Sequence, residues 1–228
     1  MIGLFDSGCG GLNTVRYLKE TEDDLDLLYL IDRENAPYGI KSEKEILEIT
    51  KNNIKVLTGM GAERVLIACC TASTVHNLLP KEQKSVSIPI ITAVADEAKR
   101  LTRTGRVGVI ATDHTVTSHA FRNALDGIYV SELALGALVT KIDSGLCDEN
   151  ITEREKIELE DMLRPILTAD IDTLILGCTH FPSLVGSIKG ITERYGEIKL
   201  IDSARVGADI LKKHKVENKW RAPARQRR

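Results

Sequence analysis

The residues best suited to chemistry in this chain are two cysteines, each at the end of a short apolar segment. Residues 65–71 align without a gap with residues 174–180, so Cys69 and Cys178 occupy equivalent positions in two similar units. The unperturbed pKa of cysteine is about 8.5, close enough to neutral pH for a thiol to give up a proton and for a thiolate to accept one. Two thiols that face one pocket from opposite sides could therefore remove a proton from one face of a carbon and return a proton to the other.

Other polar residues follow predicted strands, where the site of a parallel α/β protein forms. The polar residues that share this position are Asp6, Ser7, Thr112, Thr179 and His180. Ligands of open α/β sheets bind outside the carboxyl ends of the strands. Helices that begin there would aim backbone N–H groups at the pocket, which favours anions and lowers the pKa of a thiol.

Each of these residues also has a structural explanation. Free cysteine is among the most buried residue types, Asp6 and Ser7 could cap a helix, and His180 could be a satisfied buried histidine. However, a cysteine accompanied by a threonine recurs at the same strand end in both units. This recurrence favours a joint function.

Short apolar segments alternate with helical patterns along the chain, which is typical of a parallel α/β protein. Their near-continuous content of Val, Ile and Leu suits strands that are covered on both faces. The predicted strands span residues 2–5, 27–31, 64–68, 90–93, 107–110, 128–132, 173–176 and 199–201. Capping boxes that begin at Ser42 and Thr152 predict the starts of two helices.

The repeat extends beyond the cysteine segments. Residues 3–7 resemble residues 108–112 at a spacing of 105, against a spacing of 109 for the cysteine segments. Two matches at nearly one spacing predict two related α/β halves, with a boundary in the polar stretch near residues 96–106.

Composition and charge exclude several classes of protein. A formal net charge of −2 over 228 residues, without a basic face, argues against nucleic acid as a partner. The apolar segments are far shorter than the roughly 18 residues of a membrane helix, and the start lacks the pattern of a signal peptide. We therefore expect a cytoplasmic protein that does not bind membranes. The five cysteines form no disulfide-like pattern and are expected to stay free.

Two other kinds of site receive less support. A zinc site is one alternative, with the ligands Cys69, Cys70, Cys178 and His180. Adjacent cysteines are a poor spacing for chelation, and we expect no metal. The glycine-rich segment 8–11 lacks the G-x-G-x-x-G spacing of a dinucleotide site, so we expect a tight turn whose backbone approaches a small anion.

Four blocks of the chain resemble the signature blocks of bacterial glutamate racemases. They are residues 5–12 (FDSGCGGL), 37–39 (PYG), 68–73 (ACCTAS) and 176–182 (LGCTHFP). The blocks occur in order, and the resemblance extends from residue 2 to about residue 213. The related aspartate racemases share the two cysteines but usually lack the Pro-Tyr-Gly block and the histidine after the second cysteine.

This resemblance implies an α/β fold of two pseudo-symmetric domains with mainly parallel sheets and an active site in the cleft between them. The first domain would comprise residues 1–95 and 205–220, because the C-terminal helix returns to it, and the second would comprise residues 96–204. Residues 221–228 are basic and lack apolar periodicity, so we expect a mobile tail. The resemblance also implies a homodimer.

The resemblance further implies racemisation of L- and D-glutamate without a cofactor, which would supply D-glutamate for peptidoglycan. Cys69 as thiolate would abstract the α-proton of one enantiomer while Cys178 as thiol protonates the opposite face, and the roles would exchange in the reverse direction. Asp6 would assist the first thiol and His180 the second. The residues expected to hold the amino and carboxylate groups are Ser7, Thr71, Thr112, Thr115 and Thr179, and those expected to receive the side-chain carboxylate are Pro37, Tyr38 and Gly39.

Two positions depart from the family pattern. Cys70 occupies a substrate-binding position where the family has an asparagine, and a thiol is a weaker donor than an amide. Asp143 stands where the family tends to have a glutamate near the histidine. The change at Cys70 keeps two alternatives open: racemisation of another acidic amino acid such as aspartate, and a weakly active paralogue that binds acidic amino acids or a protein partner.

Overall fold

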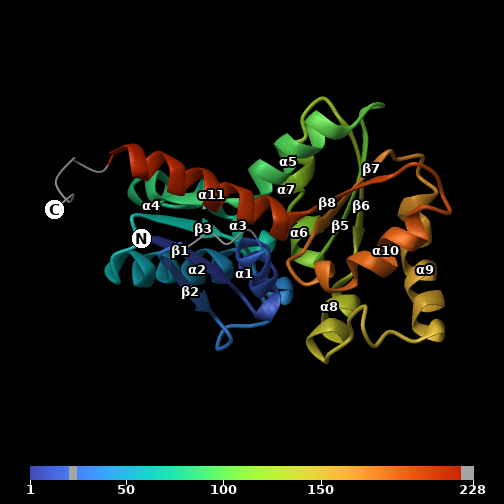
Figure 1. The fold of residues 1–228 in the computed structure, drawn as a ribbon, viewed down its shortest axis with the longest axis horizontal. Helices are drawn as coiled ribbons and strands as arrows, with labels where there is room; N and C mark the ends of the chain where they lie inside the picture. Colours follow the sequence, from blue (N-terminus) through green and yellow to red (C-terminus); the bar gives the residue numbers. More distant parts are fainter. Residues whose placement is uncertain (21–24, 222–228) are drawn as a thin grey trace.

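Two parallel sheets form the framework of the molecule. The computed structural model describes residues 1–20 and 25–221, with side chains described up to residue 213. Each sheet has four strands and is flanked by helices, and the two sheets lie side by side (Figure 1). The strand order is β2-β1-β3-β4 in the first and β6-β5-β7-β8 in the second, so the order is the same when each half is counted from its own start. The predicted α/β class, with two related parallel halves, is confirmed.

Helices and strands alternate along both halves. The strands of the first half are β1 (Ile2–Asp6), β2 (Leu27–Ile31), β3 (Arg64–Ile67) and β4 (Ser87–Pro89), and those of the second half are β5 (Arg106–Ala111), β6 (Tyr129–Ala134), β7 (Thr173–Gly177) and β8 (Lys199–Asp202). The α-helices are α1 (Leu12–Lys19), α2 (Glu43–Gly59), α3 (Cys70–Ser73), α4 (Lys81–Val86), α5 (Ile90–Leu101), α6 (Asp113–Thr117), α7 (Ala120–Ala124), α8 (Gly136–Asp143), α9 (Glu153–Leu167), α10 (Val185–Thr192) and α11 (Ser203–Arg221). Short 3-10 helices are η1 (Cys9–Gly11), η2 (Tyr38–Ile40), η3 (His76–Leu78) and η4 (Phe181–Leu184). Both predicted capping boxes are present, at the starts of α2 and α9.

One predicted strand is wrong. Residues 90–93 begin the helix α5, and the fourth strand is instead the short β4 just before it. The buried residues of α5 are Ile90, Ile91, Val94, Ala95 and Ala98. Their spacing follows the helical period, so the apolar run at residues 90–93 is the start of one helix face rather than a strand.

A buried apolar cluster continues from one sheet into the other. Leu4 and Leu66 of the first sheet belong to the same cluster as Val107 and Ile175 of the second, with further side chains from α5 and α11. The helix α11 packs against α1 and α5, so the end of the chain returns to the first sheet (Figure 1). The two halves therefore share a core.

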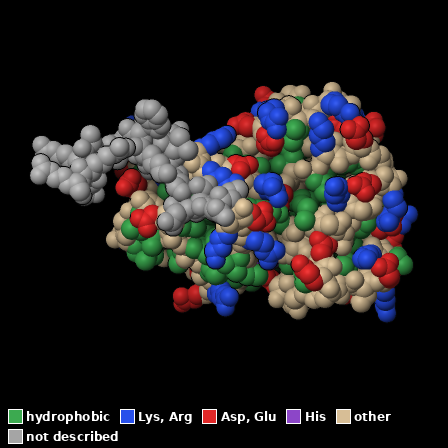
Figure 2. All heavy atoms as spheres, viewed as in Figure 1, with side chains coloured by type: hydrophobic (Ala, Val, Ile, Leu, Met, Phe, Trp, Pro, Cys, Tyr) green, Lys and Arg blue, Asp and Glu red, His purple; other side chains and the backbone are tan. Residues whose placement is uncertain are grey.

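The surface is mixed in charge. Basic and acidic side chains are interspersed over the face of the molecule shown in Figure 2. Within the described part of the chain, no helix combines the length and the apolar character needed to cross a membrane. The predicted mobile tail, apart from Arg221 at the end of α11, lies outside the described residues.

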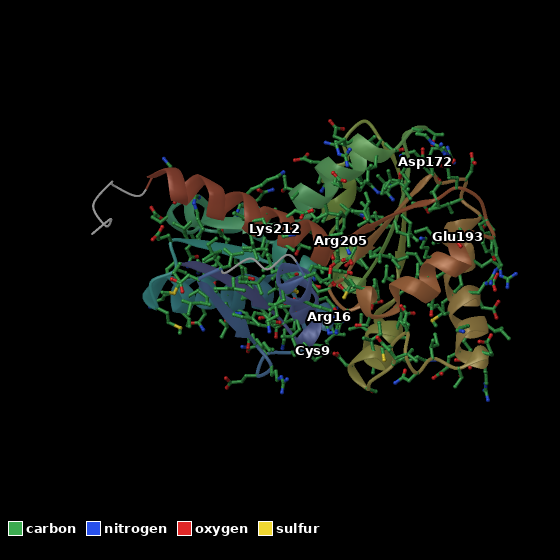
Figure 3. All side chains as sticks on the ribbon, in the orientation of Figure 1. Cys9, Arg16, Asp172, Glu193, Arg205 and Lys212 are labelled. Carbon is green, nitrogen blue, oxygen red and sulfur yellow. The ribbon has the colours of Figure 1, made fainter. Side chains whose placement is uncertain are left out.

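Asp172 holds the turn between α5 and β5. Its carboxylate accepts hydrogen bonds from the Thr102 hydroxyl at 2.7 Å, from the Arg103 amide at 2.7 Å and from the Thr104 amide at 2.6 Å. Burial alone would raise the pKa of Asp172, but these hydrogen bonds lower it far below its usual value. The carboxylate is therefore held in its charged form directly before β7, where Asp172 is labelled in Figure 3.

Asp172→Ala should lower the free energy of unfolding by about 3 kcal/mol, because two backbone amides lose a charged acceptor. A folded-state pKa below the unfolded value of about 3.9 means that this contribution is present above pH ~4 and is lost as the pH falls toward the folded pKa. Urea denaturation at neutral and acidic pH measures both effects. The control is Asp161→Ala, which removes an exposed ion pair with Arg164 and should cost less than about 1 kcal/mol. Equal losses of unfolding free energy in the two variants would show that Asp172 does not stabilise this turn.

Candidate active site

A cavity of about 580 Å³ lies where the carboxyl ends of both sheets meet. Nearly all of the predicted site residues line it: Ser7, Pro37, Tyr38, Gly39, Cys69, Cys70, Thr71, Thr112, Cys178, Thr179 and His180. Asp6 and Thr115 do not line the cavity, but each hydrogen-bonds to residues that do. The two halves thus bring the predicted residues to one place.

Cys69 lies directly before α3, close to the end of β3, and is 4% exposed. Its sulfur donates to the Ser7 hydroxyl over 3.5 Å. Burial, together with the nearby negative charge of Asp6, raises the pKa of Cys69 to about 12. The expectation that a helix start would lower this pKa is therefore wrong, because desolvation outweighs the backbone N–H groups of the four-residue helix α3.

Asp6 lies behind the cavity wall and is fully buried. It accepts hydrogen bonds from the Gly11 amide at 2.8 Å and from the Thr179 hydroxyl of the other half at 3.1 Å. Burial raises the pKa of Asp6, although the charge of His180 and these hydrogen bonds oppose the rise. Among the described side chains, no hydrogen bond joins Asp6 to Cys69, so its influence on that sulfur is electrostatic.

Cys178 follows β7 directly and has a histidine beside it. The Cys178 sulfur lies 3.5 Å from Nδ1 of His180, and Nε2 of the same ring lies 2.9 Å from Oδ1 of Asp143. The ring does not point its Nε2–H at that oxygen, so the pair meets the distance of an ion pair but not the geometry of a hydrogen bond. Burial opposes the charged imidazolium, but the adjacent Cys178 sulfur raises the pKa of His180 to about 12.

The two sulfurs therefore have neighbours of opposite charge. A carboxylate affects Cys69, whereas an imidazolium lies next to Cys178. A positive neighbour stabilises an anionic sulfur and a negative neighbour opposes it. The two sulfurs of one cavity therefore lie in electrostatically different surroundings.

Three threonine hydroxyls from the two halves form a cluster at the cavity, in which Thr115 lies behind Thr71 and Thr112. Thr71 Oγ1 lies 2.9 Å from Thr112 Oγ1 and 3.2 Å from Thr115 Oγ1, and the last two are 2.9 Å apart. Thr71 is in α3 of the first half, whereas Thr112 caps α6 of the second. Such a cluster can donate hydrogen bonds to a carboxylate.

Tyr38 lines the cavity with its body rather than with its hydroxyl. The hydroxyl donates to Asp32 at 2.5 Å and accepts from Asn53 at 2.9 Å. These partners hold the segment 37–39 in place. Because the Tyr38 hydroxyl is engaged, only the backbone of this segment and the Tyr38 ring are left to contact a ligand. Asp32 and Asn53 were not found from the sequence, since no motif separates them from other polar residues.

Cys70 is the first residue of α3 and is 2% exposed. It contacts both the cavity and the apolar cluster shared by the two sheets. Burial raises the pKa of Cys70 well above its usual value, so it remains a thiol. An amide at this position would offer two donors to the cavity, whereas the thiol offers one weak donor.

The glycine-rich turn after β1 has a packing explanation. A Cβ atom on Gly10 would lie 2.4 Å from Oγ1 of Thr179 and 2.8 Å from its carbonyl carbon, so only glycine fits. Next to it, the Asn13 side chain donates to the Thr179 carbonyl at 2.9 Å. This turn therefore brings the first half against the strand end of the second. The sequence showed the glycines but gave no signal for Asn13.

The alternative zinc site is not formed as proposed from the sequence. Among the described residues, the side chains that bring three metal-ligating atoms within 4.8 Å of one another are those of Cys9, Asp143 and His180. Cys69 and Cys70 do not belong to this group, because Cys69 donates to Ser7 and Cys70 packs into the core.

This cavity, with a thiol from each of two related α/β halves, fits the chemistry of an isomerase that works on both faces of one carbon. The family model for Asp/Glu/hydantoin racemases matches residues 13–211. The chain belongs to the Asp/Glu/hydantoin racemase family and is an amino-acid racemase.

Several similar proteins are glutamate racemases. That of Persephonella marina is 34% identical over 222 residues, which cover 95% of this chain and 83% of the relative. The crystal structure of a glutamate racemase from Bacillus anthracis matches with a TM-score of 0.83 at 28% identity, covering 96% of this chain and 82% of that one. A glutamate racemase from Francisella tularensis, solved with D-glutamate, matches with a TM-score of 0.82 at 31% identity. The match covers 96% of this chain and 81% of that one. The resemblance stated from the sequence is confirmed.

Proposed function

We propose that this protein interconverts L- and D-glutamate by moving the α-proton between Cys69 and Cys178, without a cofactor. The observation that carries the proposal is the equivalent placement of the two thiols, after β3 and β7, on one cavity. The similarity to a glutamate racemase solved with D-glutamate supports glutamate as the substrate.

In the proposed mechanism, one sulfur acts as base while the other acts as acid. Cys178, beside the imidazolium of His180, abstracts the α-proton of one enantiomer, and the Cys69 thiol protonates the opposite face. The roles exchange for the other enantiomer. Asp6 and His180 assist the sulfur nearest to each, by charge in the first case and by direct contact in the second.

The carbanion formed at the α-carbon needs stabilisation, because no electron sink takes up its charge. Preorganised donors around the α-carboxylate serve this purpose, and one such donor can contribute about 3–4 kcal/mol in the transition state. We assign the α-carboxylate and the amino group to Ser7, Thr179 and the cluster of Thr71, Thr112 and Thr115. The segment Pro37, Tyr38 and Gly39 receives the side-chain carboxylate.

The test is incubation with each glutamate enantiomer in deuterated water. Inversion accompanied by deuterium at the α-carbon is expected from both enantiomers, read by circular dichroism and mass spectrometry. Absence of exchange with both would refute racemisation of glutamate. The same assay with aspartate tests the alternative that aspartate is the substrate. Binding of glutamate without exchange would identify a binding paralogue instead.

Cys70→Asn should lower the KM for glutamate by about fivefold to 150-fold, since a restored donor to a carboxylate is worth about 1–3 kcal/mol. Initial rates over a range of glutamate concentrations measure this change. Cys70→Ala removes the thiol without adding a donor and serves as the control. Equal KM values in the two variants would show that Cys70 is not a substrate-binding position.

The similarity to the relatives also supports proposals about the domains, the location and the assembly of this protein. We propose two domains, residues 1–95 with 205–220 and residues 96–204. The packing of α11 on α1 supports the return of the chain to the first domain. The proposed boundary falls within α5, which packs against elements of both halves. We also propose a cytoplasmic homodimer that supplies D-glutamate for peptidoglycan.

A further inference from the structure

Three side chains with the donor types of a metal site meet at the edge of the cavity. Cys9 comes from η1 in the first half, Asp143 ends α8, and His180 follows β7. Their ligand atoms all lie within 4.8 Å of one another. Cys9 Sγ is 3.7 Å from Asp143 Oδ1, which is 2.9 Å from His180 Nε2. In Figure 3, Cys9 lies where the first half faces the second.

His180 contributes an independent observation. Its side chain is buried, with 5% exposed, and its Nε2 has no hydrogen-bond partner in the part of the chain that the structure describes. The other ring nitrogen, Nδ1, contacts the Cys178 sulfur. The second nitrogen of a metal-binding histidine usually donates to a carboxylate, a carbonyl or a water, which fixes the ring. In this protein the Cys178 sulfur takes the place of that partner and leaves Nε2 for an ion.

We propose that Cys9, Asp143 and His180 form a binding site for a divalent transition metal such as Zn²⁺ or Co²⁺. Zinc bonds of about 2.3 Å to sulfur and about 2.0–2.2 Å to nitrogen and oxygen, in a tetrahedron, place the ligand atoms roughly 3.3–3.6 Å apart. The distances of 3.7 Å and 2.9 Å lie close to this spacing. Three protein ligands leave a fourth position for water.

The donor set selects the class of ion. Sulfur and imidazole nitrogen favour zinc and its transition-metal neighbours over magnesium and calcium, which prefer oxygen ligands. Cys9 and Asp143 are exposed, so an ion can reach the site from solvent. Binding replaces the protons on Cys9 Sγ and His180 Nε2, and both protons are released to solvent.

Metal at this site connects the two halves of the molecule. Cys9 belongs to the first half, whereas Asp143 and His180 belong to the second. The ion would hold the halves together and occupy the imidazole that contacts Cys178. Inhibition of racemisation by the ion follows from this occupancy and rests on the proposed function, whereas metal binding itself does not.

The experiment is a titration of the chelator-treated full chain with Co²⁺ in the absence of substrate. We expect one Co²⁺ per chain and a thiolate-to-cobalt charge-transfer band in the near ultraviolet. Zn²⁺ affinity is then measured by competition with a chromophoric chelator. Cys9→Ser should abolish the band and weaken Zn²⁺ binding by at least about 10–100-fold, the loss caused even by changes next to metal ligands. Asp143→Asn should keep the band and weaken binding.

The matched control is Cys147→Ser, which removes a partly exposed thiol that is absent from the site. It should keep both the band and the affinity. A band that persists in Cys9→Ser, or is lost in Cys147→Ser, would overturn the proposal, as would the absence of stoichiometric binding by a chain with native circular dichroism. Because substrate is absent, these results do not depend on whether the protein racemises glutamate.

Discussion

Replacing Cys69 by serine should lower the rate of racemisation at least about 10³-fold in both directions, and Cys178→Ser should do the same. Each direction of the proposed reaction uses one sulfur as base and the other as acid, and a positioned acid or base contributes about 10²–10⁴-fold. Serine nearly conserves the volume of cysteine, but its hydroxyl is a far weaker acid than a thiol. The cavity therefore keeps its shape while proton transfer is lost. Circular dichroism, started from each enantiomer in turn, measures the rate.

The two serine variants should differ in the exchange that remains. Cys69→Ser retains the Cys178 sulfur, so the enantiomer whose α-hydrogen faces Cys178 should still take up deuterium without inversion. Cys178→Ser should exchange the opposite enantiomer. Cys147→Ser is the control, since Cys147 does not line the cavity and its loss should leave the rate unchanged. A wild-type rate in either active-site variant would refute the two-thiol mechanism.

Asp6→Asn should lower kcat by about 10²-fold and also shift the pH dependence of the activity that remains. The fully buried carboxylate raises the pKa of Cys69, so an amide of the same shape should let that pKa fall. In the direction that uses Cys69 as base, the rise of kcat/KM with pH should therefore move to lower pH. The loss in kcat follows because a Cys69 thiolate of lower pKa is a weaker base for the α-proton. Rate profiles between neutral and alkaline pH measure the shift.

Thr179→Val tests whether the charge of Asp6 or its hydrogen bond with Thr179 shifts the pH profile. This variant removes the hydroxyl that donates to Asp6 at 3.1 Å but leaves the carboxylate in place. Its KM should rise, because Thr179 is assigned to the substrate, while its pH profile should keep the wild-type position. An unshifted profile in Asp6→Asn would show that Asp6 only positions its neighbours.

The two related sheets could be predicted because local sequence patterns specify their strands. The two sequence matches equate Gly3 with Gly108 and Val65 with Leu174. In the structure, Gly3 pairs with Val65 and Gly108 pairs with Leu174, so two alignments at different spacings agree in strand register. Both central pairs of strands, and the cysteines that follow them, were thus placed correctly from the sequence.

Contacts between distant segments were not predictable in the same way. The hydroxyl of Tyr38 is engaged by Asp32 and Asn53, and the Thr179 carbonyl is engaged by Asn13. These partners depend on how the halves and the loops pack, and a polar residue on a helix carries no local sign of such a partner. For the same reason, burial and the charge of Asp6 reversed the expected direction of the pKa of Cys69.

The apolar cluster that runs through both sheets has a mechanical consequence. Leu4 and Leu66 cannot part from Val107 and Ile175 without exposing apolar surface to water, so the halves are not free to drift apart. The positions of Cys69 and Cys178, which follow β3 and β7 in different halves, are therefore fixed relative to one another by a core that both halves share.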